Sequence, residues 1–169
     1  MKYGVYVAYW LNDWVGDYKK YIVKAAELGF DILEISCASF ADKYTTDAQL
    51  IELRELAKEK GIILTAGYGP GKQHNPHSLD ENVRKGSFEF FKNILEKLKL
   101  MNIKNVGGGV YSYWPVDYTQ PIDKEGDWKL SVKSVKEIAK VAADCDVTLG
   151  LEVLNRFEGY LLNTCAEAL

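Results

Sequence analysis

The sequence predicts an α/β protein with a parallel sheet, because short apolar segments alternate with amphipathic helical segments along the chain. Strands in this order form parallel sheets with right-handed crossovers. Two architectures fit. A doubly wound sheet would be complete at 169 residues, whereas a (β/α)8 barrel has about 250 residues, so the chain would supply its first half and a little more. Five segments read as strands: residues 3–10, 31–37, 62–68, 103–110 and 147–153.

The segments between these strands carry apolar residues at helical spacing. Gly61 ends the second of them, and Thr45 or Thr46 can cap its start. Residues 164–169 read as the first turn of a further helix. No linker or low-complexity segment divides the chain, so we expect a single domain. The predicted helices span residues 17–30, 47–61, 78 or 80 to about 100, and 128–146.

The composition is that of an ordinary globular protein, with 47% hydrophobic and 27% charged residues. The net charge of −3 argues against a nucleic-acid partner, which requires a clustered basic face. No apolar run approaches the roughly 20 residues that span a bilayer, and the N-terminus lacks the pattern of a signal peptide, so we expect no membrane partner. Cys37, Cys145 and Cys165 lie far apart, which favours reduced thiols and a cytoplasmic location.

Aromatic, glycine and carboxylate residues gather where the predicted strands end. In a barrel, the active site lies at this face. Spacing alone favours a core role for the aromatic residues after the first strand, but the combination as a whole suits a sugar, because aromatic faces cover C–H surfaces and carboxylates accept from hydroxyls. The residues after the five strands are Tyr6, Tyr9, Trp10 and Trp14; Glu34 and Ser36; Gly67, Tyr68, Gly69 and Pro70; Gly107, Gly108, Gly109, Tyr111, Tyr113 and Trp114; Glu152, Asn155, Arg156 and Glu158.

Glu152 is the most informative of these residues, because it lies inside the apolar run 147–153. A carboxylate in such a position is more often a ligand or an acid/base group than a core residue. Glu34 is ambiguous between a structural ion pair and a functional role. The glycine run at 107–109 lacks the spacing of a phosphate loop and favours close approach of a ligand or side chain. The H-x-x-H pair at 74–77 has no helix to align it, which disfavours a metal site.

Five stretches resemble the ketose 3-epimerases, the group of D-tagatose 3-epimerase and D-psicose (allulose) 3-epimerase among the xylose-isomerase-like barrels. They are KYGVYVAYW, LGFDILEISC, LTAGYGP, GGGVYSYWPVDY and LEVLNRFEGYLLNT, and they span essentially the whole chain. The resemblance implies a TIM-type (β/α)8 barrel of which this chain supplies about the first five β-strands and four helices. Residues 1–169 are then the N-terminal part of a single barrel domain. It also implies an isomerase that epimerises a free ketose at C3, of the D-psicose/D-fructose or D-tagatose type, through an enediolate.

The same resemblance implies roles for six residues. Glu152 corresponds to a metal ligand that is also one of two acid/base glutamates, and Glu158 to the group that binds the substrate's terminal hydroxyl end. Gly109 stands where alanine is common in relatives, which could alter substrate preference. The substrate-binding positions are Tyr6, Gly67, Gly109, Trp114 and Glu158.

The resemblance further implies a divalent metal, Mn²⁺ first and Mg²⁺ or Co²⁺ as alternatives. The family's other ligands, an Asp, a His and a second Glu, come from later strands, so we expect the 169 residues alone to be inactive. The expected partners are a small-molecule ketose and further copies of the chain in a homo-oligomer. Two alternatives stay open: a non-catalytic half-barrel that self-associates, and another barrel enzyme of the endonuclease-IV-like type, which the acidic charge opposes.

Overall fold

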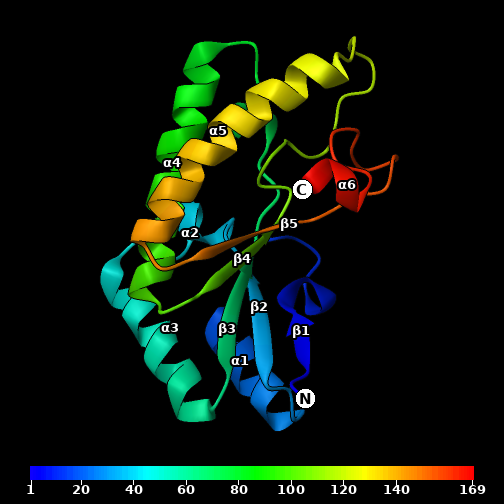
Figure 1. Ribbon diagram of the computed structural model, residues 1–169. Coiled ribbons are helices and arrows are strands. Elements are labelled where there is room, and N and C mark those ends of the chain that lie inside the picture. The colour runs from blue at the N-terminus through cyan, green and yellow to red at the C-terminus, as the bar shows by residue number, and fades with distance from the viewer. The chain divides into compact units, whose positions relative to one another are not determined.

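The computed structural model describes residues 1–169, with all side chains except those of Ala41 and Asp42. The strands form one sheet in the order β1-β2-β3-β4-β5 (Figure 1). The sequential order confirms the predicted parallel arrangement and contradicts a doubly wound sheet, in which the strand order reverses at a switch point. The strands are β1 (Gly4–Tyr6), β2 (Ile32–Ser36), β3 (Ile63–Gly67), β4 (Asn105–Gly108) and β5 (Thr148–Leu151).

The first strand is shorter than the sequence predicts. Residues 7–10 form a 3-10 helix, η1 (Val7–Trp10), in place of a strand continuation. The turn lets Trp10 stack on Tyr21 with 5.6 Å between ring centroids, and Lys24 Nζ lies 4.6 Å from the centre of the Trp10 ring. This aromatic packing explains why the chain leaves the sheet directly after Tyr6.

The helices agree with the predicted order and add three short pieces. The predicted cap of α3 is confirmed at Thr46, whose Oγ1 accepts from Gln49 N, and Gly61 ends the helix at φ 71°. Helix α5 begins four residues before its predicted start, because Asp123 Oδ1 accepts from Gly126 N at 3.0 Å. The bounds are α1 (Tyr18–Glu27), α2 (Ser39–Asp42), α3 (Asp47–Lys60), η2 (Lys72–His74), α4 (Glu81–Leu100), α5 (Lys124–Asp144) and α6 (Cys165–Ala168).

The contacts divide the chain into two compact units. Unit 1 contains residues 1–67, 94–106 and 145–148, and unit 2 contains residues 68–93, 107–144 and 149–169. In unit 1, α1 packs against α3 and β2. Its core includes the buried Leu33 and Ile35 of β2.

In unit 2, the first half of α4 and the helix α5 lie side by side (Figure 1). A buried cluster of Tyr111, Leu161 and Leu162 joins the segment after β4 to the segment after β5. Among the described residues, no helix is long and apolar enough to cross a membrane.

Candidate functional site

In unit 1, the carboxyl ends of three neighbouring strands bring together Tyr6, Glu34 and Gly67. Tyr6 is the last residue of β1 and lies opposite Glu34, which in turn lies opposite Thr65. Thr65 Oγ1 donates to Glu34 Oε2 at 3.4 Å, and the Tyr6 ring packs on Trp14 with centroids 6.0 Å apart. A Cβ at Gly67 would lie 3.0 Å from Glu34 Oε1 and 3.6 Å from Tyr6 Cζ. The lack of a side chain at Gly67 therefore makes space for the Glu34 carboxylate.

In unit 2, the predicted close approach at the glycine run is made by the backbone of the chain itself. Gly108 has φ +113°, and a Cβ there would lie 2.4 Å from the carbonyl oxygen of Tyr68. Tyr68 N donates to Gly107 O at 2.9 Å, which fixes the two segments against each other. Gly109 differs, because a Cβ at this position would have no heavy atom within 4 Å. Within the run 107–109, Gly108 is therefore the position at which a side chain would clash with the backbone.

Trp114 is held at the backbone, and its side chain is partly exposed. Its N–H donates to Pro70 O at 2.7 Å, and the Trp114–Pro115 peptide bond is cis. The residue is 40% exposed. A Cβ at Gly69 would be 3.6 Å from Trp114 Cβ, an ordinary van der Waals contact. The segment after β3 thus contacts the backbone and Cβ of Trp114, which the family resemblance assigns to substrate binding.

Glu152 directly follows β5, and its side chain is exposed. The expectation of a carboxylate enclosed in an apolar strand is therefore wrong, because the strand ends at Leu151. The backbone is well held: Glu152 N donates to Gly108 O at 3.2 Å, and Tyr111 Oη donates to Glu152 O at 2.8 Å. Burial, and next the negative charge of Glu152, raise the pKa of Tyr111 to about 12. The carboxylate of Glu152 is left open to solvent on a fixed backbone.

Glu158 lies in a turn that other residues of unit 2 hold in place. Its N–H donates to Asn155 O and Asn155 Oδ1 at 3.1 and 3.2 Å. Asn163 Nδ2 donates to two carbonyls of the same segment at 2.8 Å, and Tyr118 Oη donates to Arg156 O at 2.8 Å. The Glu158 side chain itself is exposed. A fixed backbone with an open carboxylate is the arrangement that a ligand-binding residue needs.

The six predicted site residues fall into both units. Tyr6 and Gly67 belong to unit 1, whereas Gly109, Trp114, Glu152 and Glu158 belong to unit 2. Glu34 belongs with Tyr6 and Gly67 in unit 1. Its contacts with Thr65 and Gly67 could not be predicted from the sequence.

The donor set of the described residues does not make a metal site by itself. Among these residues, no group of three or more His, Cys, Asp or Glu side chains could hold a metal ion. The two histidines of the H-x-x-H pair make other contacts. The His74 ring stacks on Phe90 with 3.8 Å between ring centroids, and His77 Nε2 lies 3.0 Å from Ser112 Oγ. Glu152 therefore belongs to no such group among the described residues.

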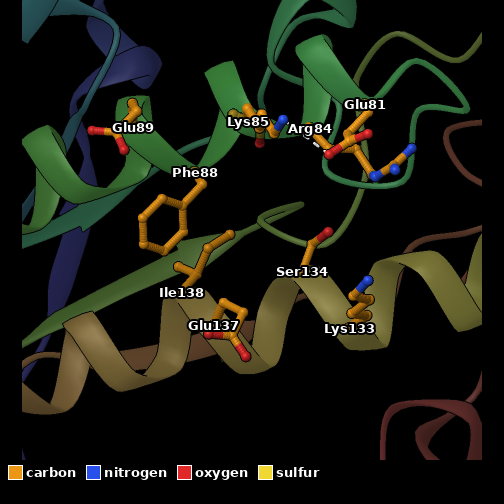
Figure 2. Close-up of a pocket in the computed structure, with 10 residues that line it drawn as sticks. Glu81, Arg84, Lys85, Phe88, Glu89, Lys133, Ser134, Glu137 and Ile138 are labelled. Carbon is orange, nitrogen blue, oxygen red and sulfur yellow. Dashed lines mark ion pairs between the residues drawn. The ribbon is translucent and has the colours of Figure 1, made fainter.

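A cavity of about 250 Å³ lies between α4 and α5, apart from the candidate residues. Figure 2 shows Phe88 and Ile138 facing each other from the two helices, with charged side chains around them. One ion pair, Lys85 Nζ to Glu81 Oε1 at 2.9 Å, borders it. None of the predicted site residues lines this cavity.

Acidification is expected to destabilise the protein below about pH 6.5. Burial lowers the pKa of His74 and His77 below the usual value for histidine, so the unfolded chain takes up protons before the folded chain does. The stabilisation is complete above the unfolded pKa and is lost as the pH falls through it, by at most about 1.4 kcal/mol per pH unit for each histidine. Urea unfolding at pH 7.5 and 5.5 measures this loss. The double variant His74→Gln/His77→Gln should show a smaller loss, and an equal loss would contradict the assignment to these histidines.

The chain matches the family model described as xylose isomerase-like TIM barrel over residues 22–169. It belongs to this family. It is 59% identical over all 169 residues to the D-psicose 3-epimerase of Enterocloster bolteae, and 50% identical over 99% of its length to that of Ruminiclostridium cellulolyticum. A crystal structure of D-psicose 3-epimerase with D-tagatose from Clostridium cellulolyticum H10 superposes with a TM-score of 0.96, at 50% identity over 99% of this chain and 57% of that one.

The match covers only part of the relatives. The chain spans 56% of the length of the Enterocloster bolteae and Ruminiclostridium cellulolyticum enzymes. The sequential five-stranded sheet and the family membership together establish a TIM-barrel architecture, of which this chain supplies a part.

Proposed function

We propose that the chain is part of a ketose 3-epimerase, an isomerase that inverts C3 of a free ketose of the D-psicose/D-fructose or D-tagatose type. The observation that carries the proposal is the 59% identity to a D-psicose 3-epimerase along the entire chain. Two further relatives with this name are 50% and 46% identical. The match covers the whole chain and so includes the strand ends, where a barrel enzyme holds its reacting groups.

The chemistry assigned to Glu152 is proton transfer at C3. The C3 proton is acidified by the neighbouring C2 carbonyl, and its removal gives an enediolate that is reprotonated from the opposite face. Glu152 suits one of the two bases, because its carboxylate is solvent-exposed while its backbone is held by Gly108 and Tyr111. The second base is expected from strands that relatives carry beyond the matched part.

The remaining residues would bind and orient the sugar. The aromatic rings of the half-buried Tyr6 and the exposed Trp114 would cover its C–H surfaces, and the carboxylate of Glu158 would accept hydrogen bonds from its hydroxyls. Gly67 and Gly109 would leave space for the sugar chain. This set is a proposal that rests on the family resemblance and on the fixed backbones around Trp114 and Glu158.

We also propose that Glu152 is one ligand of a divalent cation, Mn²⁺ first and Mg²⁺ or Co²⁺ next. Such a cation, when bound, would stabilise negative charge on the sugar oxygens. The described residues alone do not fit a bound cation, because they bring no group of three or more His, Cys, Asp or Glu side chains together. Mn²⁺ titration by isothermal calorimetry is expected to detect no tight site in the 169-residue chain.

The proposal also covers the cellular location, the oligomeric state and the partners of the protein. The three cysteines are free, as expected of a protein in the reducing cytoplasm. We expect a homo-oligomer, which sedimentation velocity can establish, and a free ketose as the small-molecule partner. The acidic net charge of −3 favours neither nucleic acid nor an anionic membrane surface.

A chimera tests the proposed function. Residues 1–169 of this chain are fused to the remainder of the Enterocloster bolteae enzyme, and D-psicose formed from D-fructose is measured with Mn²⁺ in excess. We expect the chimera to epimerise and the 169-residue chain alone to show no conversion. A folded chimera without activity would contradict the proposed function. Conversion by the chain alone would contradict the expectation that further ligands and a second base are needed.

Gly67→Ala is expected to weaken ketose binding in the chimera. The new Cβ would lie 3.0 Å from Glu34 Oε1, so the carboxylate must shift by a few tenths of an ångström, beside the Tyr6 ring. We expect KM for D-fructose to rise about tenfold, a loss of about 1.4 kcal/mol of binding free energy. The matched control is Gly86→Ala, where a Cβ within α4 meets no heavy atom within 4 Å. An unchanged KM in Gly67→Ala would contradict the assignment of Gly67 to the binding site.

A further inference from the structure

His77 is a buried titratable side chain of unit 2 that is not among the candidate site residues. It is 3% exposed and lies in the segment between β3 and α4. Its Nε2 is 3.0 Å from Ser112 Oγ, in the segment after β4, and its Nδ1 is 3.7 Å from Asp127 Oδ1, in the first turn of α5. Tyr160 Oη, in the segment after β5, donates to the other Asp127 oxygen at 2.6 Å. One imidazole and one carboxylate thus connect the three segments that follow β3, β4 and β5.

The protonation state of this cluster follows from its surroundings. Burial lowers the pKa of His77, although the negative charge of Asp127 acts in the opposite direction. The ring is therefore neutral at neutral pH. The nearby carboxylate favours the proton on Nδ1, which leaves Nε2 to accept from the Ser112 hydroxyl. Burial, and next the bond to Asp127, raise the pKa of Tyr160, which keeps its hydroxyl a donor. Nε2 of His77 and the hydroxyl of Tyr160 then each have a hydrogen-bond partner, and the Nδ1–H faces the Asp127 carboxylate at 3.7 Å.

The order Ser112, His77, Asp127 is that of a hydrolytic triad, but the geometry does not suit a nucleophile. Ser112 is only 6% exposed, so a substrate carbonyl could not reach its Oγ. The Asp127 carboxylate is shared with Tyr160, and 3.7 Å is too long for a hydrogen bond to the imidazole. A structural linkage is therefore the role that these distances support.

The segments that meet at His77 are those that carry proposed site residues. Ser112 lies two residues before Trp114, and the His77 ring packs near the Tyr113 ring with centroids 5.6 Å apart. Tyr160 lies two residues after Glu158 and packs edge-on to His77 at 6.1 Å. A shift of the imidazole would therefore be passed to both segments.

We propose that His77 is a positioning residue that, through Ser112, Asp127 and Tyr160, fixes the segment bearing Glu158 to the segment bearing Trp114. Its importance for catalysis rests on the proposed epimerase function. The structural linkage itself does not depend on that function, because its contacts are present in the chain without any sugar.

Backbone amide hydrogen exchange of the 169-residue chain tests the linkage directly. Tyr160→Phe removes one hydroxyl and keeps the ring, so amides of residues 153–163 should exchange about fivefold faster, the factor expected for one ordinary hydrogen bond. His77→Leu keeps an apolar side chain of similar size and should accelerate exchange in residues 111–114 as well as 153–163. His77→Gln should restore part of the protection, because its amide can still bond to Ser112.

The matched control is Tyr18→Phe, which removes a buried tyrosine hydroxyl in unit 1, where Tyr18 Oη donates to Ser36 O at 2.6 Å. It should leave exchange in residues 153–163 unchanged. The proposal is overturned if Tyr160→Phe and His77→Leu leave these amides at wild-type rates, if Tyr18→Phe accelerates them equally, or if Gln is no better than Leu at position 77. In the chimera, Tyr160→Phe should raise KM for D-fructose about fivefold with kcat within twofold. Altered exchange in a chimera that lacks activity would contradict the epimerase function and leave the linkage standing.

Discussion

Replacing Glu152 with glutamine is expected to lower kcat of the chimera by about 10²- to 10⁴-fold, the range that a positioned general acid/base contributes. The amide has nearly the same shape but cannot accept the C3 proton. The backbone contacts that hold residue 152, from its N–H to Gly108 O and from Tyr111 Oη to its carbonyl, do not involve the side chain. The loss should therefore appear in turnover and not in stability. The measurement is the initial rate of D-psicose formation at saturating D-fructose, alongside the urea midpoint.

Two further variants separate the role of Glu152 from a general effect of charge. Glu158→Gln is expected to act mainly on KM, since this residue is assigned to binding. Glu59→Gln removes an exposed carboxylate of α3 that pairs with Lys60 and should change neither parameter. Near-normal turnover in Glu152→Gln would show that another group removes the C3 proton.

The second large effect is expected at Gly108. Alanine there would take up φ +113°, a conformation that side chains rarely adopt, and would bring Cβ within 2.4 Å of the carbonyl oxygen of Tyr68. Strain and overlap together should lower the free energy of unfolding by about 2–5 kcal/mol. Urea unfolding of the 169-residue chain measures the change.

Gly109→Ala is the matched control, one residue along the chain. A Cβ at this position would meet no heavy atom within 4 Å, so the change in stability should stay within about 0.5 kcal/mol. Equal destabilisation by both substitutions would indicate that the glycine run is needed for chain flexibility and not for the contact with Tyr68.

Local sequence signals predicted much of the fold. The alternation of strands and helices predicted a parallel sheet, and the family resemblance predicted its sequential order as part of a barrel. A threonine cap at 45 or 46 and Gly61 predicted the bounds of α3. Element ends were less accurate where packing decides them. The chain leaves the sheet after Tyr6 because Trp10 packs on α1, and β5 stops at Leu151, which exposes Glu152.

The contacts around the candidate residues could not be predicted in the same way. His77 meets Ser112, Asp127 and Tyr160, which lie 35, 50 and 83 positions further along the chain and share no motif with it. The need for glycine at 108 depends on where the backbone of Tyr68 passes, which a local pattern does not contain. The identity of the candidate residues came from family resemblance, and their support came only from the folded chain.

The most direct test of the account is the isotope content of the product formed in D₂O. If Glu152 removes the C3 proton and a second group returns one from the opposite face, the D-psicose made from D-fructose by the chimera must carry solvent deuterium at C3. Proton NMR should then show the C3–H signal of the new D-psicose to be missing, and Glu152→Gln should form neither product nor deuterated D-fructose at a comparable rate. D-Psicose that retains its C3 hydrogen, or unchanged deuterium uptake in Glu152→Gln, would contradict the account.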